Sequence, residues 1–321
     1  MRDLTSVPSP LADDANVALA DWAEMSAILK EDGTVSREDL ARALSRTHSV
    51  SEATGKDQAD DTFNELQDRV DACAPIQNSA LSAYPFELQN NGALLALRRS
   101  TQSNYGLVYS FLLTITRADM GSKARKLEGV DPTKVFERLC AEVLSAFWGG
   151  TSAYSGSLIF GTARKKQSDN HRFQSNIEHL CEQIGEGAGF RTDALAPGAG
   201  DGNLDVVAWR RFPDLRPGNL VGFAQCKTGI HWRQGLRELN PANFCRLFMK
   251  KPLILEPVRI YMVPSRIDRS QWEANAGDGG ILFDRCRVLQ FSSQVQREVT
   301  DDIRTWLTRA LEIQKGGRVT A

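Results

Sequence analysis

The first third of the chain carries apolar residues at helical spacing, interrupted by polar stretches. Leu19, Trp22, Met25 and Leu29 recur three or four positions apart, which places them on one face of an α-helix. The sequence EDGT ends this helix, and Ser36 is a typical N-cap for the next one. We expect helices over residues 16–29, from 37 onward, over 62–73 and over 104–118, with a flexible leader at 1–14 and a linker at 51–61.

From Asp131 onward the chain switches between helical and strand periods. Asp131, Pro132 and Thr133 fit a helix cap and first turn, and an apolar stripe follows in KVFERLCAEVLSAFW. Apolar runs of strand length then flank the turn sequence FPDLRPGN. We expect helices over residues 134–148, 172–185, 233–250 and 300–314, and strands over 203–212, 219–229, 258–264 and 281–291.

This order of elements predicts an α/β fold. The length of 321 residues is enough for one large domain or two ordinary ones. We divide the chain after the leader into a helical N-terminal region of residues 15–130, suited to sensing a trigger or docking a partner, and a second domain of residues 131–321. The first region has more acidic than basic residues and the second the reverse, which is compatible with polyanion binding by the second domain.

Composition places the chain among soluble globular proteins. Hydrophobic residues make up 41% and charged residues 25% of the sequence, both ordinary values for that class. There is no apolar run of about 18 residues and no signal-peptide pattern, so we expect a cytoplasmic protein without a membrane span. The six cysteines lie far apart without a CxxC motif. This spacing argues against a zinc site and favours buried, reduced thiols.

Polar side chains interrupt two neighbouring apolar strands. Strand alternation puts Gln225 and Lys227 on one face of the expected strand 219–229. Asp205 lies inside the preceding strand, and an antiparallel pairing would bring it opposite this pair. A lysine within an apolar strand needs a partner, because an unpaired buried charge is costly. A partly buried salt bridge between Lys227 and Asp205 is the simplest structural explanation.

The same three residues suit phosphodiester hydrolysis. A carboxylate and other oxygen ligands can hold Mg²⁺ or Mn²⁺, which lowers the pKa of a bound water. A lysine can orient that water and offset charge in the transition state. The catalytic hypothesis therefore assigns the metal to Asp205 and the transition-state charge to Lys227.

The segments GDGNLDVVAW and GFAQCKTG together resemble the PD-(D/E)xK nuclease superfamily, in the variant in which Gln replaces the second acidic residue. Mrr-type restriction endonucleases are similar. The resemblance covers about residues 131–265 and maps the family's Asp, Gln and Lys onto Asp205, Gln225 and Lys227. The family's helical Glu, often within Phe-Glu-x-Leu, maps onto Glu137. The helix expected at 172–185 offers Glu178 and Glu182 as alternatives, since they lie closer in sequence to Asp205.

The resemblance implies a restriction-endonuclease-like core, in which helices flank a mixed central sheet. It implies an Mg²⁺-dependent endonuclease with metal ligands at Asp205, Glu137 and Cys226, a preference for DNA, and a role in restriction or anti-phage defence, with a helicase or ATPase as a possible partner protein. A non-catalytic nuclease-fold subunit that binds nucleic acid or a partner protein is the alternative. Arg164, Lys165 and Lys166 form a basic cluster that contacts phosphates in the functional hypothesis and is a solvated loop otherwise.

Overall fold

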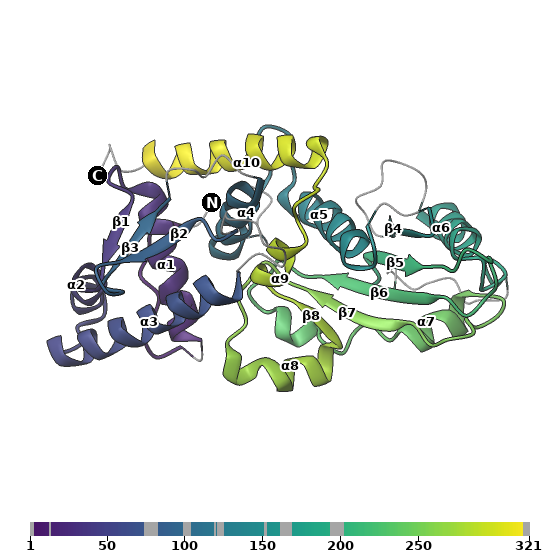
Figure 1. The fold of residues 1–321 in the computed structure, drawn as a ribbon, viewed down its shortest axis with the longest axis horizontal. Helices are drawn as coiled ribbons and strands as arrows, with labels where there is room; N and C mark the ends of the chain where they lie inside the picture. Colours follow the sequence, from purple (N-terminus) through teal and green to yellow (C-terminus); the bar gives the residue numbers. More distant parts are fainter. Residues whose placement is uncertain are drawn as a thin grey trace.

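The protein is mixed α/β, with a three-stranded and a five-stranded sheet among its described residues (Figure 1). The computed structural model describes residues 3–12, 14–73, 83–98, 104–118, 120, 125–150, 153–160, 169–192 and 202–316. The expectation of an α/β protein is thereby confirmed. No helix in these ranges is both long and apolar enough to cross a bilayer.

The N-terminal region contains a small sheet that the sequence patterns did not predict. Its strands pair in the order β1-β3-β2, all antiparallel. The predicted cap at Ser36 is confirmed, because its side chain accepts a hydrogen bond from the backbone N–H of Asp39. The predicted linker at 51–61 is wrong, because Ser51 caps a helix that runs through it. The elements are α1 (Ala15–Leu29), β1 (Thr34–Ser36), α2 (Arg37–His48), α3 (Glu52–Ala72), β2 (Phe86–Gln89), β3 (Leu94–Leu97) and α4 (Asn104–Arg117).

The described part of the predicted leader, residues 3–12 and 14, is packed against the protein. Leu4 is fully buried, and its N–H donates to Gln314 near the far end of the chain. Arg117 at the end of α4 donates to the Leu4 carbonyl at 2.8 Å. The leader pattern was polar, but Leu4 and Val7 pack on the hydrophobic core and the backbone carbonyls between them are hydrogen-bonded to other parts of the protein.

The five-stranded sheet follows the order β4-β5-β6-β7-β8. β4, β5 and β6 form an antiparallel meander, whereas β6, β7 and β8 are parallel. The expectation of a mixed sheet is therefore met, although β4 lies in a segment where no strand was predicted. The strands are β4 (Ser155–Ile159), β5 (Val206–Arg210), β6 (Leu220–Cys226), β7 (Val258–Met262) and β8 (Ile281–Phe283).

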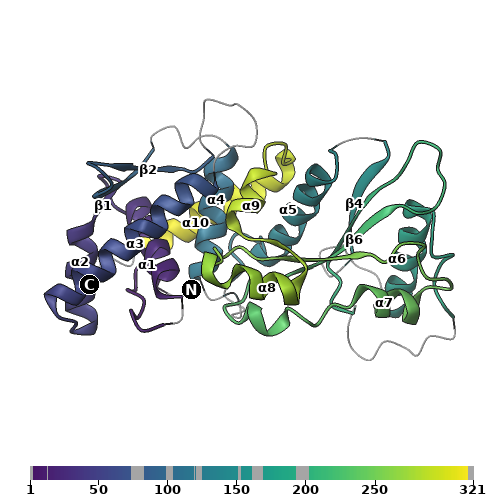
Figure 2. The same cartoon turned by 60° about the horizontal axis from the view of Figure 1, so that its bottom comes forward.

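Helices cover both faces of this sheet, with α5 on one side and α7 on the other (Figures 1 and 2). Two predicted elements are each divided. The expected strand 281–291 ends at Phe283, because Asp284 caps a short helix. The expected helix 233–250 is a 3-10 turn followed by a separate helix capped by Asn240. The helical elements are α5 (Pro132–Phe147), α6 (Asp169–Ile184), η2 (Trp232–Gly235), α7 (Pro241–Phe248), η3 (Arg269–Gln271), α8 (Trp272–Gly279), α9 (Arg285–Gln290) and α10 (Arg297–Gly316).

One hydrophobic cluster joins the N-terminal region to the α5 face of the large sheet. It extends from Leu4 through α1 and α4 to Val206 and Ala224 in the sheet and to Trp306 in α10. The last helix, α10, lies along α4 and α5 (Figure 1). The residue-130 boundary thus does not separate two hydrophobic cores.

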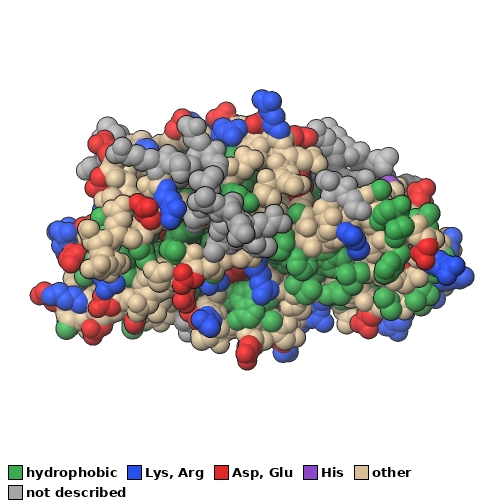
Figure 3. Space-filling model, in the orientation of Figure 1, with side chains coloured by type: hydrophobic (Ala, Val, Ile, Leu, Met, Phe, Trp, Pro, Cys, Tyr) green, Lys and Arg blue, Asp and Glu red, His purple; other side chains and the backbone are tan. Residues whose placement is uncertain are grey.

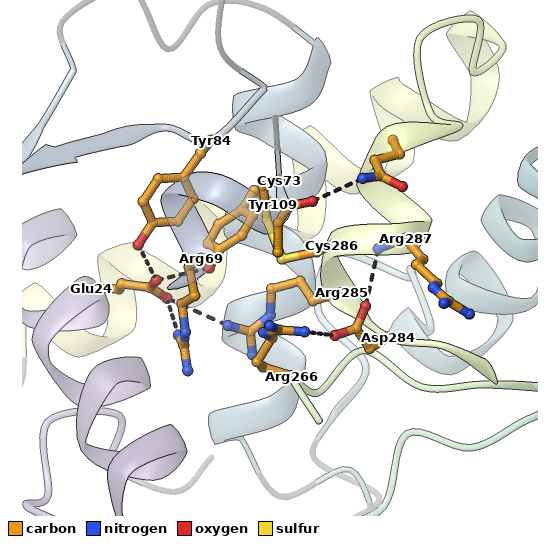
Figure 4. Close-up of a disulfide and its surroundings, with 12 residues drawn as sticks. Glu24, Arg69, Cys73, Tyr84, Tyr109, Arg266, Asp284, Arg285, Cys286 and Arg287 are labelled. Carbon is orange, nitrogen blue, oxygen red and sulfur yellow. Dashed lines mark hydrogen bonds and ion pairs between the residues drawn. A yellow bond between two sulfur atoms is a disulfide. The ribbon is translucent and has the colours of Figure 1, made fainter. Parts of the chain in front are cut away.

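A buried ionic cluster connects α1 and α3 with the start of α9. Arg285 donates to both carboxylate oxygens of Asp21, at 2.8 and 2.9 Å. Arg69 bridges Asp21 at 2.6 Å and Glu24 at 2.9 Å. Glu24 also accepts from the Tyr84 hydroxyl (Figure 4). Because each of these charges has an opposite partner, the cost of burying them is offset.

A disulfide lies beside this cluster and joins Cys73, at the end of α3, to Cys286 in α9 (Figure 4). The expectation of reduced thiols is therefore wrong for these two residues. They are 213 positions apart in the sequence, so only the packing of α9 against α3 reveals the pair. The other four cysteines are free.

Candidate metal centre at the end of the central sheet

The predicted site residues from the two strands meet at one end of the five-stranded sheet. β5 and β6 are antiparallel, so the start of β5 lies beside the end of β6. Asp205 immediately precedes β5, and Lys227 immediately follows β6. The backbone N–H of Lys227 donates to the Met262 carbonyl at the end of β7. Three strand ends therefore surround the candidate site.

Asp205 is fixed through both its backbone and its side chain. Its N–H donates to the Ala224 carbonyl at 3.0 Å, and its carbonyl accepts from the Phe160 N–H at 2.7 Å. Its Oδ2 accepts from the backbone N–H of Cys226 at 2.7 Å. A hydrogen bond between a carboxylate and a backbone N–H is charge-assisted and short. The carboxylate is thus held against the last residue of β6.

Gln225 is almost fully buried, with 1% of its surface exposed. Its Nε2 donates to Oε2 of Glu238 at 2.9 Å. Its Oε1 is also buried and has no hydrogen-bond partner. Burying an amide oxygen without a hydrogen-bond donor or a bound cation costs free energy. An amide oxygen is also a ligand that Mg²⁺ and Mn²⁺ accept.

Lys227 pairs with Glu238 rather than with Asp205. Its Nζ lies 2.9 Å from Oε2 of Glu238, and the two side chains are 34% and 42% exposed. The hydrogen bond from Lys227 holds the pKa of Glu238 below its usual range. The simple structural explanation of a Lys227–Asp205 salt bridge is therefore wrong.

Glu238 was missed in the sequence. It lies between the buried Leu236 and Leu239, in the segment that links η2 to α7. No motif surrounds it, and the helix expected over 233–250 did not predict that the Glu238 side chain would point toward β6. The only available signal was an acidic residue 11 positions after the lysine in the strand.

Glu137 lies on α5, which packs on the face of the sheet opposite to the segment that carries Glu238. Burial raises the pKa of the Cys226 thiol well above its usual range, and the Cys140 thiol, Asp205 and Glu137 add to that effect. Burial likewise raises the pKa of Cys140, with contributions from Glu137 and Asp205. Both carboxylates thus lie near the same two thiols. Burial thus disfavours the Cys226 thiolate, and a hard cation prefers oxygen ligands, so the backbone carbonyl of Cys226 suits its predicted role as a metal ligand better than the thiol does.

The alternative acids Glu178 and Glu182 lie elsewhere. The carbonyls of Gln183 and Ile184, next to Glu182, accept from Arg211 and Asn219 at the opposite ends of β5 and β6. A strand of this length separates its ends by roughly 15–20 Å. Glu182 is 78% exposed and lies near His179.

Glu178 is exposed and accepts a hydrogen bond from Gln174 on its own helix. The C-terminal end of α6 thus carries Glu182 away from the site, whereas α5 packs against β5 and β6.

The basic cluster of Arg164, Lys165 and Lys166 lies outside the described residues. On the face drawn in Figure 3, basic and acidic side chains are interspersed. The described surface seen there therefore does not mark a path for a polyanion.

The donor set fits a hard divalent cation. Asp205 offers carboxylate oxygen and Gln225 an unsatisfied amide oxygen, both preferred by Mg²⁺. Within the described ranges, no group of three or more His, Cys, Asp or Glu side chains is arranged to hold a metal ion. A bound ion would therefore rely on amide, backbone and water oxygens in addition to carboxylate. No family model, curated protein or solved structure matches this chain.

Proposed function

We propose that this protein is a metal-dependent endonuclease that hydrolyses phosphodiester bonds, with DNA as the favoured substrate. The observation that carries the proposal is the buried, unpartnered Oε1 of Gln225, next to Asp205 and Lys227 at one end of the sheet. A mixed sheet between helices, preceded by a helix that carries Glu137, agrees with the PD-(D/E)xK resemblance. DNA preference, a defence role and an ATPase partner rest on that resemblance alone.

The residues divide the chemistry between them. Asp205 and the Gln225 amide oxygen would hold Mg²⁺ or Mn²⁺, and Glu137 would add a second carboxylate from α5. When bound, such an ion polarises the phosphate and lowers the pKa of a coordinated water. Lys227 would place its ammonium beside the attacking water and offset the charge that develops on the phosphate. The partial exposure of Lys227 leaves room for a phosphodiester to approach.

A second candidate is a nuclease-fold subunit without catalytic activity. The ion pair between Glu238 and the Lys227 ammonium favours this candidate, because the lysine already has a protein partner. In that case the site would be structural, and the protein would bind nucleic acid or a partner without cutting.

Cleavage assays separate the two candidates. Supercoiled plasmid, linear duplex and single-stranded RNA are incubated with the full chain in Mg²⁺, in Mn²⁺ and in EDTA. The proposal expects cleavage of at least one substrate with a divalent cation and none in EDTA. Binding of nucleic acid without cleavage in any cation would support the non-catalytic subunit and contradict the endonuclease.

A further inference from the structure

The amide of Gln225 presents different chemistry at its two ends. Its oxygen accepts hydrogen bonds or binds a cation, whereas its nitrogen donates two hydrogen bonds and repels a cation. A rotation by 180° exchanges the two ends at almost no change in shape. A glutamine can therefore serve a metal site only if something fixes which end faces it.

Glu238 supplies that fixing interaction. Its ionised carboxylate can only accept, so it selects the Nε2 end of Gln225 and leaves Oε1 on the opposite side. The same oxygen, Oε2, also accepts from Lys227 at 2.9 Å. We propose that Glu238 is a positioning residue, whose carboxylate turns the Gln225 amide oxygen toward the metal position and holds Lys227 beside it. This inference rests on the proposed function.

The surroundings of Glu238 leave this cluster little freedom. A Cβ atom on Gly235 would lie 2.8 Å from the Tyr261 hydroxyl, 3.2 Å from Cε of Lys227 and 3.3 Å from Oε2 of Glu238. The Tyr261 hydroxyl is itself held by a hydrogen bond to the Trp232 carbonyl. A side chain at position 235 would thus collide with the Tyr261 hydroxyl and press against Lys227 and Glu238.

The expected consequence is a coupling between positions 225 and 238. In Glu238→Gln, the new amide can donate as well as accept, so it no longer selects one end of Gln225. In a Gln225→Leu background there is no amide to orient, and no second carboxylate is placed against Glu238. The effect of changing Glu238 should therefore depend on which residue occupies position 225.

Mn²⁺ titration by calorimetry, without nucleic acid, measures that coupling in four proteins: the wild type, each single variant and the double variant. We expect Glu238→Gln to weaken Mn²⁺ binding about 10–100-fold in the wild-type background, as loss of an outer-shell partner does. In the Gln225→Leu background the change should stay within about threefold, a coupling well above experimental scatter. Glu273→Gln, an exposed change on α8, is the matched control and should leave binding unchanged. Equal losses in both backgrounds would overturn the positioning role.

A metal-free measurement keeps this test separate from the proposed function. The side-chain amide protons of Gln225 are assigned by NMR from their absence in Gln225→Leu. We expect slow hydrogen exchange of these protons in the wild type and faster exchange with a shifted signal in Glu238→Gln. An unchanged amide signal would overturn the inference. If the wild type binds no Mn²⁺ while the amide signal behaves as expected, the proposed function fails and the orientation by Glu238 stands.

Discussion

At the scale of single residues, the candidate centre depends on which partner each polar atom has. Asp205 is held by a backbone N–H, Gln225 by one end of its amide, and Lys227 by Glu238. The Lys227–Glu238 pair is more than one-third exposed on average, so solvent screens it and its contribution to stability is about 0–1 kcal/mol. A residue so placed can matter for chemistry without mattering for folding.

Removing the Lys227 ammonium should therefore abolish cleavage and leave folding intact. Its proposed interaction with the phosphate is made mainly in the transition state, so its loss should lower kcat rather than affinity. We expect Lys227→Ala to cut about 10²–10³-fold more slowly, while its melting temperature and duplex binding match the wild type.

The matched control for this prediction is Lys251→Ala, an exposed lysine beyond α7, which should behave as wild type. Cleavage by Lys227→Ala at the wild-type rate would remove the basis for a catalytic lysine. A sharp fall in its melting temperature would instead show that the ion pair is structural.

At the scale of elements, two helices compete for the role of the carboxylate-bearing helix. α5 packs across β4, β5 and β6 and brings Glu137 near Cys140 and Cys226. α6 packs on the other face, with its C-terminal end at the far ends of β5 and β6. The assignment of the second carboxylate to Glu137 on α5 therefore stays a prediction.

Glu137→Gln and Glu182→Gln form a matched pair that tests this arrangement. If Glu137 supplies a metal ligand, its amide variant should lose more than the roughly 10–100-fold that an outer-shell change costs. Glu182 is 78% exposed, and its variant should cut like the wild type. Both are measured as cleavage rates over a range of Mg²⁺ concentrations, with circular dichroism to check helix content. Equal activity of the two variants would exclude α5 as the source of the second carboxylate.

At the scale of the whole molecule, the buried ionic cluster binds the N-terminal region to the end of the chain. Burial alone would raise the pKa of Asp21, but Arg285 and Arg69 outweigh it and hold that pKa well below its usual range. A carboxylate with a depressed pKa in the folded state contributes stability above its unfolded pKa, about 3.9. That contribution is lost as the pH falls from there toward the folded-state pKa. Burial raises the pKa of the neighbouring Glu65, so ionisation of Glu65 lowers the stability of the folded state as the pH rises.

Acid should therefore destabilise the wild type more steeply than an Asp21→Asn variant. At pH 7 the variant should be less stable by about 3–5 kcal/mol, because it leaves two buried guanidiniums short of a partner. Below about pH 4 the gap in unfolding free energy should narrow, by at most about 1.4 kcal/mol for each pH unit. Urea unfolding at a series of pH values measures both effects. The exposed Asp60→Asn is the control, and parallel pH profiles for wild type and Asp21→Asn would contradict the assignment.

The sequence by itself determined most features that depend on local periodicity. The helices around Leu19 and Phe136 and the strands on either side of the 211–219 turn follow from apolar spacing, which records the face that each element buries. The same alternation placed Gln225 and Lys227 together. Features without a period were missed or misjudged, such as the short strand β4, the split at Asp284 and the polar first half of α3.

Only the tertiary structure decided which distant groups meet. Glu238 lies 11 positions beyond Lys227 and Cys286 lies 213 beyond Cys73, and no local pattern encodes either contact. Asp21 and Glu24 occur in a helix whose pattern gives no sign that they are buried, since their partners come from α3 and α9. Periodicity reports which face of an element is apolar. The partner of a buried polar atom depends on where other elements pack, because hydrogen bonds and ion pairs form only at short range.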